Sequence, residues 1–279
     1  MVRECCDTPS NFRYTKTLEE ELEEHGIPCL SGVDTRMLTK IIRETGRPMA
    51  AIVEAEMPKD EALALIAATP RPKDLLRRVG CRKRWVTRTS NHLYHVVAVD
   101  CGIKQSILSR LKERGCNVTI VPFTTSAKDI LAFNPDGVLL SNGPVSALDA
   151  PEVRALFAEL KGKIPVFGIG LGMEAIGLEY GAKLVPMGCG MHGDHPVKDL
   201  VTGRINIAVL NQTYRFDTVE GTALTPTHVL VPEGYVLGFE NTEDKVFGVQ
   251  FHLESAPGPQ DNVYLFDKFI VMMEGQCHA

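Results

Sequence analysis

The sequence predicts an α/β fold in which a mostly parallel sheet is flanked by helices and follows a smaller amino-terminal domain. From residue 93 onward, short apolar runs alternate with amphipathic stretches, which is the pattern of strands and helices in a parallel sheet. Before residue 92 the apolar residues recur only at helical spacing. The chain has 279 residues, 44% of them hydrophobic, and can bury the cores of two domains. We therefore expect domains over residues 1–92 and 93–279.

Three helices are expected in the first domain. The stretch "TLEEELEEHG" begins with Thr17, which can cap a helix together with Glu20 in a capping box. A second helix lies in "GVDTRMLTKIIRETG", where Asp34 or Thr35 provides the cap. The third lies in "PKDEALALIAATP" and ends before Pro70.

The segment from residue 71 to residue 91 is rich in basic residues and has little apolar periodicity. We interpret it as a solvated linker, because the whole chain carries a formal charge of −5 and a single Trp. A nucleic-acid partner is not expected on this evidence. The basic residues concerned are Arg77, Arg78, Arg82, Lys83, Arg84 and Arg88.

Strands and helices then alternate along the second domain. Expected strands lie in "YHVVAVDCG", "NVTIVPF", "GVLLSNG" and "IPVFGIG", and expected helices in the segments 103–114, 126–134, 149–160 and 171–181. The last third is richer in β pattern, with candidate strands in "INIAVL", "YRFDTV", "THVLVP" and "KVFGVQFH". Ligands of such sheets bind at the carboxyl ends of the parallel strands.

The turn at Gly170 is spaced like a nucleophile elbow, because glycines stand at 168 and 172 between a strand and a helix. The residue at the centre of such a turn attacks the substrate, and the next backbone N–H, here that of Leu171, donates to the oxyanion. A dinucleotide-binding loop would need glycine at position 173, which is Met. Glycines that only let a helix pack closely on a strand are the structural alternative.

Two further elements at expected strand ends fit hydrolytic chemistry. His252 and Glu254 are two apart after an apolar strand, so an extended backbone places both on one side, where the carboxylate can orient the imidazole as a general base. Gly143 follows another strand and can bring a second N–H to an oxyanion. Taken singly, each has a plain structural alternative, namely a surface histidine and an ordinary loop.

Motifs along nearly the whole chain resemble the small, glutamine-hydrolysing subunit of carbamoyl-phosphate synthetase. They include "GVDTRMLTKIIRETG", "HVVAVDCGIKQSIL", "NPDGVLLSNGP", "IPVFGIGLG" and "HLESAPGP". The resemblance implies a class I, triad-type glutamine amidotransferase domain from about residue 93, preceded by a partial amino-terminal domain that docks on the large synthetase subunit. It also implies a place in arginine and pyrimidine biosynthesis.

The resemblance assigns roles to individual residues. His252 and Glu254 match two members of a Cys-His-Glu triad, and Leu171 and Gly143 match the oxyanion donors. Further contacts to L-glutamine are implied for Glu174, Asn211 and Tyr214, which stand where the family usually has Gln, Asn and Phe. Neither a cofactor nor a metal is implied, and the eight cysteines show no zinc-ligand spacing.

The chain departs from the family at the reacting position itself. The family's "GICLGHQ" is "GIGLGME" here, so Cys becomes Gly170, His becomes Met173 and Gln becomes Glu174. Its "SNGPGDP" is "SNGPVSA", which puts Val145 in place of a glycine. The start of the chain matches a point inside the family's amino-terminal domain, so a glutamine-binding serine of that region has no counterpart.

These departures predict a protein with little or no glutaminase activity. The leading hypothesis is a structural or regulatory partner of a large subunit that uses free ammonia. The alternative is a divergent enzyme in which the His252 and Glu254 pocket performs other hydrolytic or acid–base chemistry. An engineered Gly170 alone would not explain Met173, Glu174 and Val145. No run approaches the roughly 18 apolar residues of a membrane span, and we expect a cytoplasmic protein.

Overall fold

The computed structural model describes residues 1–46 and 48–277, and it divides into two compact units, Met1–Pro72 and Lys73–Ala279. The division comes before the expected boundary near residue 92. The segment interpreted as a solvated linker instead forms helix α4 (Leu75–Val79) and strand β1 (Trp85–Thr87) of the second unit. Hydrogen bonds fix it there, since the amide of Cys81 donates to the Asp100 carboxylate at 2.9 Å.

The first unit contains the three expected helices, α1 (Leu18–Glu24), α2 (Thr35–Thr45) and α3 (Lys59–Ala68). The capping box of α1 is present, with Thr17 and Glu20 bonding each other's backbone N–H groups. Asp34, rather than Thr35, caps α2 by accepting a hydrogen bond from the amide of Met37. Within the described part of these helices no residue is buried.

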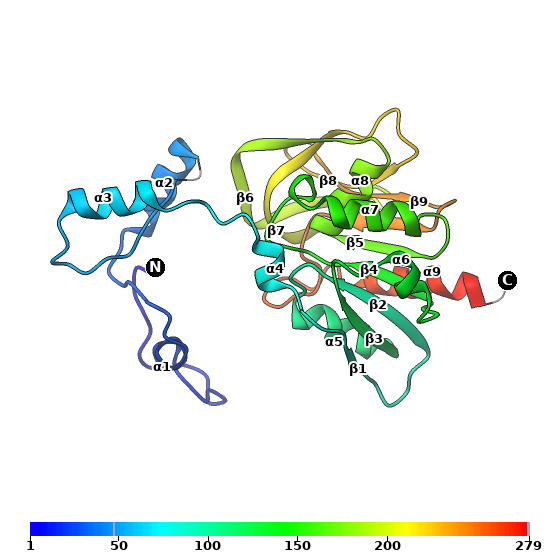
Figure 1. Ribbon diagram of the computed structural model, residues 1–279, viewed down its shortest axis with the longest axis horizontal. Coiled ribbons are helices and arrows are strands. Elements are labelled where there is room, and N and C mark those ends of the chain that lie inside the picture. The colour runs from blue at the N-terminus through cyan, green and yellow to red at the C-terminus, as the bar shows by residue number, and fades with distance from the viewer. Residues whose placement is uncertain (47, 278–279) are drawn as a thin grey trace. The chain divides into compact units, whose positions relative to one another are not determined.

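The second unit is built on one ten-stranded sheet in the order β1-β3-β2-β4-β5-β10-β9-β7-β6-β8 (Figure 1). Strands β3, β2, β4, β5 and β10 run parallel, as expected for alternating strands and helices. The bounds of the strands after β1 are β2 (Tyr94–Asp100), β3 (Cys116–Pro122), β4 (Gly137–Leu140), β5 (Val166–Ile169), β6 (Lys183–Asp199), β7 (Ile205–Thr218), β8 (Thr225–Leu230), β9 (Val236–Asn241) and β10 (Val246–Val249).

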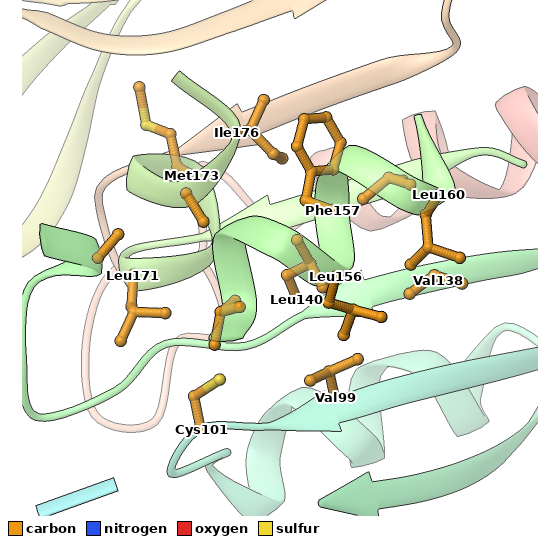
Figure 2. Packing of buried hydrophobic residues seen from close by; sticks show 14 of the residues in the cluster. Val99, Cys101, Val138, Leu140, Leu156, Phe157, Leu160, Leu171, Met173 and Ile176 are labelled. Atoms are coloured by element: carbon orange, nitrogen blue, oxygen red, sulfur yellow. The ribbon is translucent and has the colours of Figure 1, made fainter. Parts of the chain in front are cut away.

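Helices cover both faces of the parallel region, and each face has its own hydrophobic core. One core joins α6 (Ala127–Leu131), α7 (Pro151–Leu160) and α8 (Leu171–Glu179) to the sheet, and Figure 2 shows Leu171, Met173 and Ile176 of α8 among its members. The other lies under α5 (Gln105–Glu113) and α9 (Tyr264–Cys277). Such burial of large apolar side chains stabilises the fold by about 25 cal/mol per Å².

Four elements of the last third, β6, β7, β9 and α9, differ from expectation. The runs "INIAVL" and "YRFDTV" form the single strand β7, because the polar residues between them pair with β6 and continue the ladder. Strands β6 and β9 and helix α9 were not predicted.

Among the described helices, none is long and apolar enough to cross a lipid bilayer.

A buried polar network joins the end of β6 and the middle of β8 to the start of α9. The Tyr264 hydroxyl donates to Asp199 at 2.9 Å and lies 3.1 Å from His228 Nε2, while His228 Nδ1 lies 2.9 Å from the Thr227 hydroxyl. Burial lowers the pKa of His228 to about 4, although the nearby Asp199 acts in the opposite direction. The imidazole is therefore neutral in the folded protein at neutral pH.

The pKa of His228 predicts an acid-sensitive contribution to stability. Because the pKa is 6.5 when exposed and about 4 when folded, protonation favours the unfolded chain as the pH falls from 6.5 to 4. We expect the free energy of unfolding to fall over this window by about 3 kcal/mol more than in His228→Gln. Urea unfolding at pH 7, 5.5 and 4 measures this, and equal losses in both proteins would contradict it.

Candidate functional site

The turn between β5 and α8 has the backbone of a nucleophile elbow. Gly170 lies there with φ 55° and ψ −112°, a left-handed conformation that side chains adopt only with strain. Its amide donates to the carbonyl of Val249 at 2.8 Å, which ties the turn to the end of β10. A Cβ at this position would approach only Asn142, whose Cβ would lie at 3.4 Å, an ordinary van der Waals contact. The turn therefore has space for a Cβ atom, although its positive φ would strain any side chain placed there.

The flanking glycines serve a different purpose. A Cβ at Gly172 would overlap the carbonyl oxygen of Leu140, and one at Gly168 would lie 2.6 Å from Ile176 Cδ1. Both positions thus require glycine so that α8 can lie close against β4 and β5. Close packing thus explains the glycines at 168 and 172, whereas Gly170 has the positive φ of an elbow, and the catalytic use of the turn stays a prediction.

The loop after β4 meets the elbow at the place expected for an oxyanion hole. A Cβ on Gly143 would lie 2.9 Å from Leu171 Cδ1 and 2.7 Å from the carbonyl oxygen of Cys101, so the loop backbone packs directly on the first residue of α8. Residues Cys101, Leu140 and Leu171 share one hydrophobic cluster (Figure 2). The structure thus brings Gly143 and Leu171 together, while their role as donors stays a prediction.

The imidazole and carboxylate predicted after β10 are in contact. His252 Nδ1 lies 2.9 Å from Glu254 Oε1, and the His252 amide donates to Val209 of β7 at 2.9 Å. Strand β10 lies parallel to β5, so His252 follows a strand whose neighbour ends at Ile169, directly before Gly170. The carboxylate of Glu254 is fully buried, whereas 22% of the His252 side chain is exposed. The pair can therefore present an oriented imidazole to a ligand.

A lysine completes this group. Lys104 Nζ donates to Glu254 Oε1 at 2.7 Å and to the carbonyl of Ala256 at 2.8 Å. Burial opposes ionisation of Glu254, but the hydrogen bonds from His252 and Lys104 outweigh it and lower its pKa to about 2. The carboxylate is therefore charged at all physiological pH values. Sequence reasoning missed Lys104, although its place just after β2, at the carboxyl end of a parallel strand, was a usable signal.

The side chain of Glu174 is engaged by the protein itself. Its Oε2 accepts hydrogen bonds from the Ser146 hydroxyl and the Ala147 amide, both at 2.9 Å, and its Oε1 accepts one from Gln250 Nε2 at 3.0 Å. Only 5% of the residue is exposed. Glu174 thus holds the loop after β4 to the end of β10, and its expected contact with glutamine stays a prediction.

The other predicted contact residues lie on β7. Asn211 is exposed, and its Oδ1 lies 2.9 Å from His192 Nδ1 on the paired strand β6. Tyr214 is half-buried and packs against the core beneath α8. The bridge between Val209 and His252 places this strand beside the site. The glutamine contacts implied for Asn211 and Tyr214 also stay predictions.

Known proteins resemble this chain in sequence and in overall fold. The family model "Glutamine amidotransferase class-I" matches residues 97–272, and "Carbamoyl-phosphate synthase small chain, CPSase domain" matches residues 1–52. The carbamoyl phosphate synthase small chain of Listeria monocytogenes serotype 4b (strain F2365) is 41% identical over 286 residues, covering 100% of this chain and 78% of the relative. The chain belongs to the carbamoyl-phosphate synthase small-chain family.

Other small chains match to a similar degree. That of Bacillus caldolyticus is 39% identical, and that of Staphylococcus epidermidis (strain ATCC 35984) is 41% identical; each match covers 98% of this chain and 75% of the relative. The crystal structure of a putative GMP synthase protein from Thermoplasma acidophilum superimposes with a TM-score of 0.59 at 20% identity, covering 67% of this chain and 97% of that one. The predicted family and fold class are confirmed.

Two departures from the small-chain motif are internal to the fold. Met173 is fully buried in the core with Leu171, and a Cβ at Gly248 would lie 2.9 Å from its Cγ, so it fills space between α8 and β10. Glu174 is satisfied by Ser146, which stands where the resemblance has Asp.

Proposed function

We propose that this small chain is a pseudo-glutaminase, one that keeps the amidotransferase fold without hydrolysing glutamine through a covalent intermediate. One observation carries the proposal: the residue at the centre of the elbow is Gly170, which has no side chain to attack a carbonyl carbon. Removal of the nucleophile from a catalytic triad costs on the order of 10⁶ in turnover.

The same proposal gives the protein a partner. Since the relatives are named small chains, we propose that this one assembles in the cytoplasm with a carbamoyl-phosphate synthetase large subunit. That subunit would then take free ammonia. The chain would act on it as a structural or regulatory component in the synthesis of carbamoyl phosphate for arginine and pyrimidines.

Ammonia release from glutamine tests the proposal. The protein, alone and mixed with the large subunit of a related synthetase, is expected to release ammonia at a rate indistinguishable from protein-free buffer. Carbamoyl phosphate formation by the mixture from ammonium chloride is expected to continue. Glutamine turnover near that of an intact small chain would overturn the proposal.

A second candidate function rests on the retained imidazole. Among the described residues only Nδ1 of His252 has a hydrogen-bond partner, so Nε2 is free to accept a proton from a bound water. Glu254 and Lys104 hold the ring in place. This arrangement fits general-base hydrolysis of a substrate without a protein nucleophile.

His252→Ala distinguishes the two candidates. If the protein shows any hydrolytic activity with amides or esters, this change is expected to lower kcat by about 10²-fold or more, because the general base is lost. Ligand binding by calorimetry, before and after the change, serves as the control for folding. Activity that persists in His252→Ala would eliminate the second candidate.

A further inference from the structure

The strand at one edge of the sheet, β1, is flanked by closely spaced basic residues. Within the described residues of the second unit, strand β1 pairs with β3 alone, so its other side is an unpaired edge of the sheet (Figure 1). We call the segment from Arg82 to Arg88 the basic edge. Between residues 75 and 99 the sequence contains six Lys or Arg residues and no Asp or Glu. The charge is therefore not neutralised along the chain.

Several of these charged side chains have no partner in the part of the chain that the structure describes. Arg82, Lys83 and Arg88 are exposed, and among the described residues none of the three side chains has a hydrogen bond or ion pair. Arg84 differs, since its guanidinium lies over the Phe133 ring at 5.0 Å. Three cations are thus free to meet negative groups brought to this edge.

The backbone of β1 can pair with a further extended segment. In its antiparallel ladder with β3, Val86 lies opposite Thr119, and alternate residues direct their N–H and C=O groups away from β3. The side chains of Trp85 and Val86 remain 39% and 45% exposed, which gives an added strand apolar surface to cover. Backbone hydrogen bonds with alternating side-chain contacts are the basis of strand addition to a sheet edge.

The positive charge of the basic edge determines which kind of extended segment can pair with β1. Lys and Arg beside a short edge strand repel a second copy of the same edge, which is how proteins prevent edge-to-edge association. The same charges attract an extended segment that carries carboxylates. We infer that the basic edge is a docking site at which an acidic, extended peptide segment of a partner protein adds to the sheet beside β1.

A nucleic acid is the weaker candidate for the same charges. Single strands are held by basic grooves with several aromatic rings on which successive bases stack. The basic edge offers one such ring, that of Trp85, which is also the single Trp of the chain. The backbone N–H and C=O groups on the unpaired side of β1 are instead complementary to an extended peptide.

Trp85 supplies the reporter for the test. The probe is a synthetic peptide of alternating Glu and Val without aromatic residues, titrated into the full protein while the fluorescence of Trp85 is followed. The first control is the same peptide with Pro in place of each Val, because Pro has no backbone N–H to donate. The second control is a single-stranded oligonucleotide of equal charge. The basic-edge variant combines Arg82→Glu, Lys83→Glu and Arg88→Glu. The matched control variant combines Lys163→Glu, Lys198→Glu and Arg204→Glu.

The acidic peptide is expected to shift the emission of Trp85 and to bind at least tenfold more weakly to the basic-edge variant. The matched variant, whose changed residues are exposed on other parts of the same unit, is expected to bind within twofold of the parent. The inference is overturned if no peptide binding is detected, if the Pro-containing peptide binds equally well, if both variants weaken binding alike, or if the oligonucleotide binds more tightly. Circular dichroism of both variants confirms that they are folded.

Discussion

Gly170→Cys is expected to create glutaminase activity in this protein, at least about 10²-fold above the parent. The elbow backbone is already formed, and a Cβ at 170 would meet only Asn142, at 3.4 Å. His252, oriented by Glu254, is present to accept the thiol proton. The new side chain must adopt a φ of about 55°, so we expect it to lower the stability by about 1 kcal/mol. Ammonia release and thermal unfolding measure both effects.

Two matched variants show whether the new activity uses the predicted groups. Gly170→Ser carries the same Cβ with a weaker nucleophile and is expected to be much less active. Gly170→Cys with His252→Ala is expected to lose the gain. If Gly170→Cys binds glutamine but releases no ammonia, the His252 and Glu254 pair is not aligned with the elbow, and the reconstructed triad is wrong.

Glu174→Ala is expected to destabilise the protein by about 4 kcal/mol, because a buried donor left without its acceptor costs about 1–3 kcal/mol. Three donors lose their acceptor together: the Ser146 hydroxyl, the Ala147 amide and the Gln250 side-chain amide. Urea unfolding at pH 7 measures the change. A loss below about 1 kcal/mol would show that the loop after β4 is held by other contacts.

Glu174→Gln is the matched control and is expected to keep the fold. The Gln250 Oε1 is buried and unpartnered, so a rotation of that amide lets it accept from the new Gln side chain. Burial raises the pKa of Glu174, against the hydrogen bonds from Ala147, Ser146 and Gln250. Because the pKa of Glu174 is higher in the folded protein than in the unfolded chain, the protonated carboxyl stabilises the fold below pH 4.5. This stabilisation is lost as the pH rises through the pKa of the folded state. Glu174→Gln should remove this loss, so its stability should depend less on pH than that of the parent above pH 4.5.

Local patterns predicted the parts of the site that are close together in the chain. Spacing alone identified the turn at Gly170 and the pair His252 and Glu254, because a strand-to-helix turn and an extended dipeptide step fix geometry over a few residues. The parallel core followed from the alternation of apolar runs. The capping box at Thr17 was equally local.

Contacts between distant segments were beyond such patterns. Lys104 and Glu254 meet only because β2 and β10 lie in one sheet, and no spacing links residues on separate strands. The contact of Glu174 with Ser146 likewise depends on how α8 sits against the loop after β4. Strand β1 was missed because three residues flanked by basic side chains carry too little periodicity to outweigh the charge.

The overlap that any side chain at Gly172 would make with Leu140 has a consequence for how such a protein can evolve. Selection to keep α8 packed on β4 acts on that glycine whether or not the neighbouring residue performs chemistry. A lineage that loses the nucleophile therefore keeps its glycine signature for as long as it keeps its fold. The glycines at 168 and 172 therefore report on the packing of α8, and only residue 170 reports on a nucleophile.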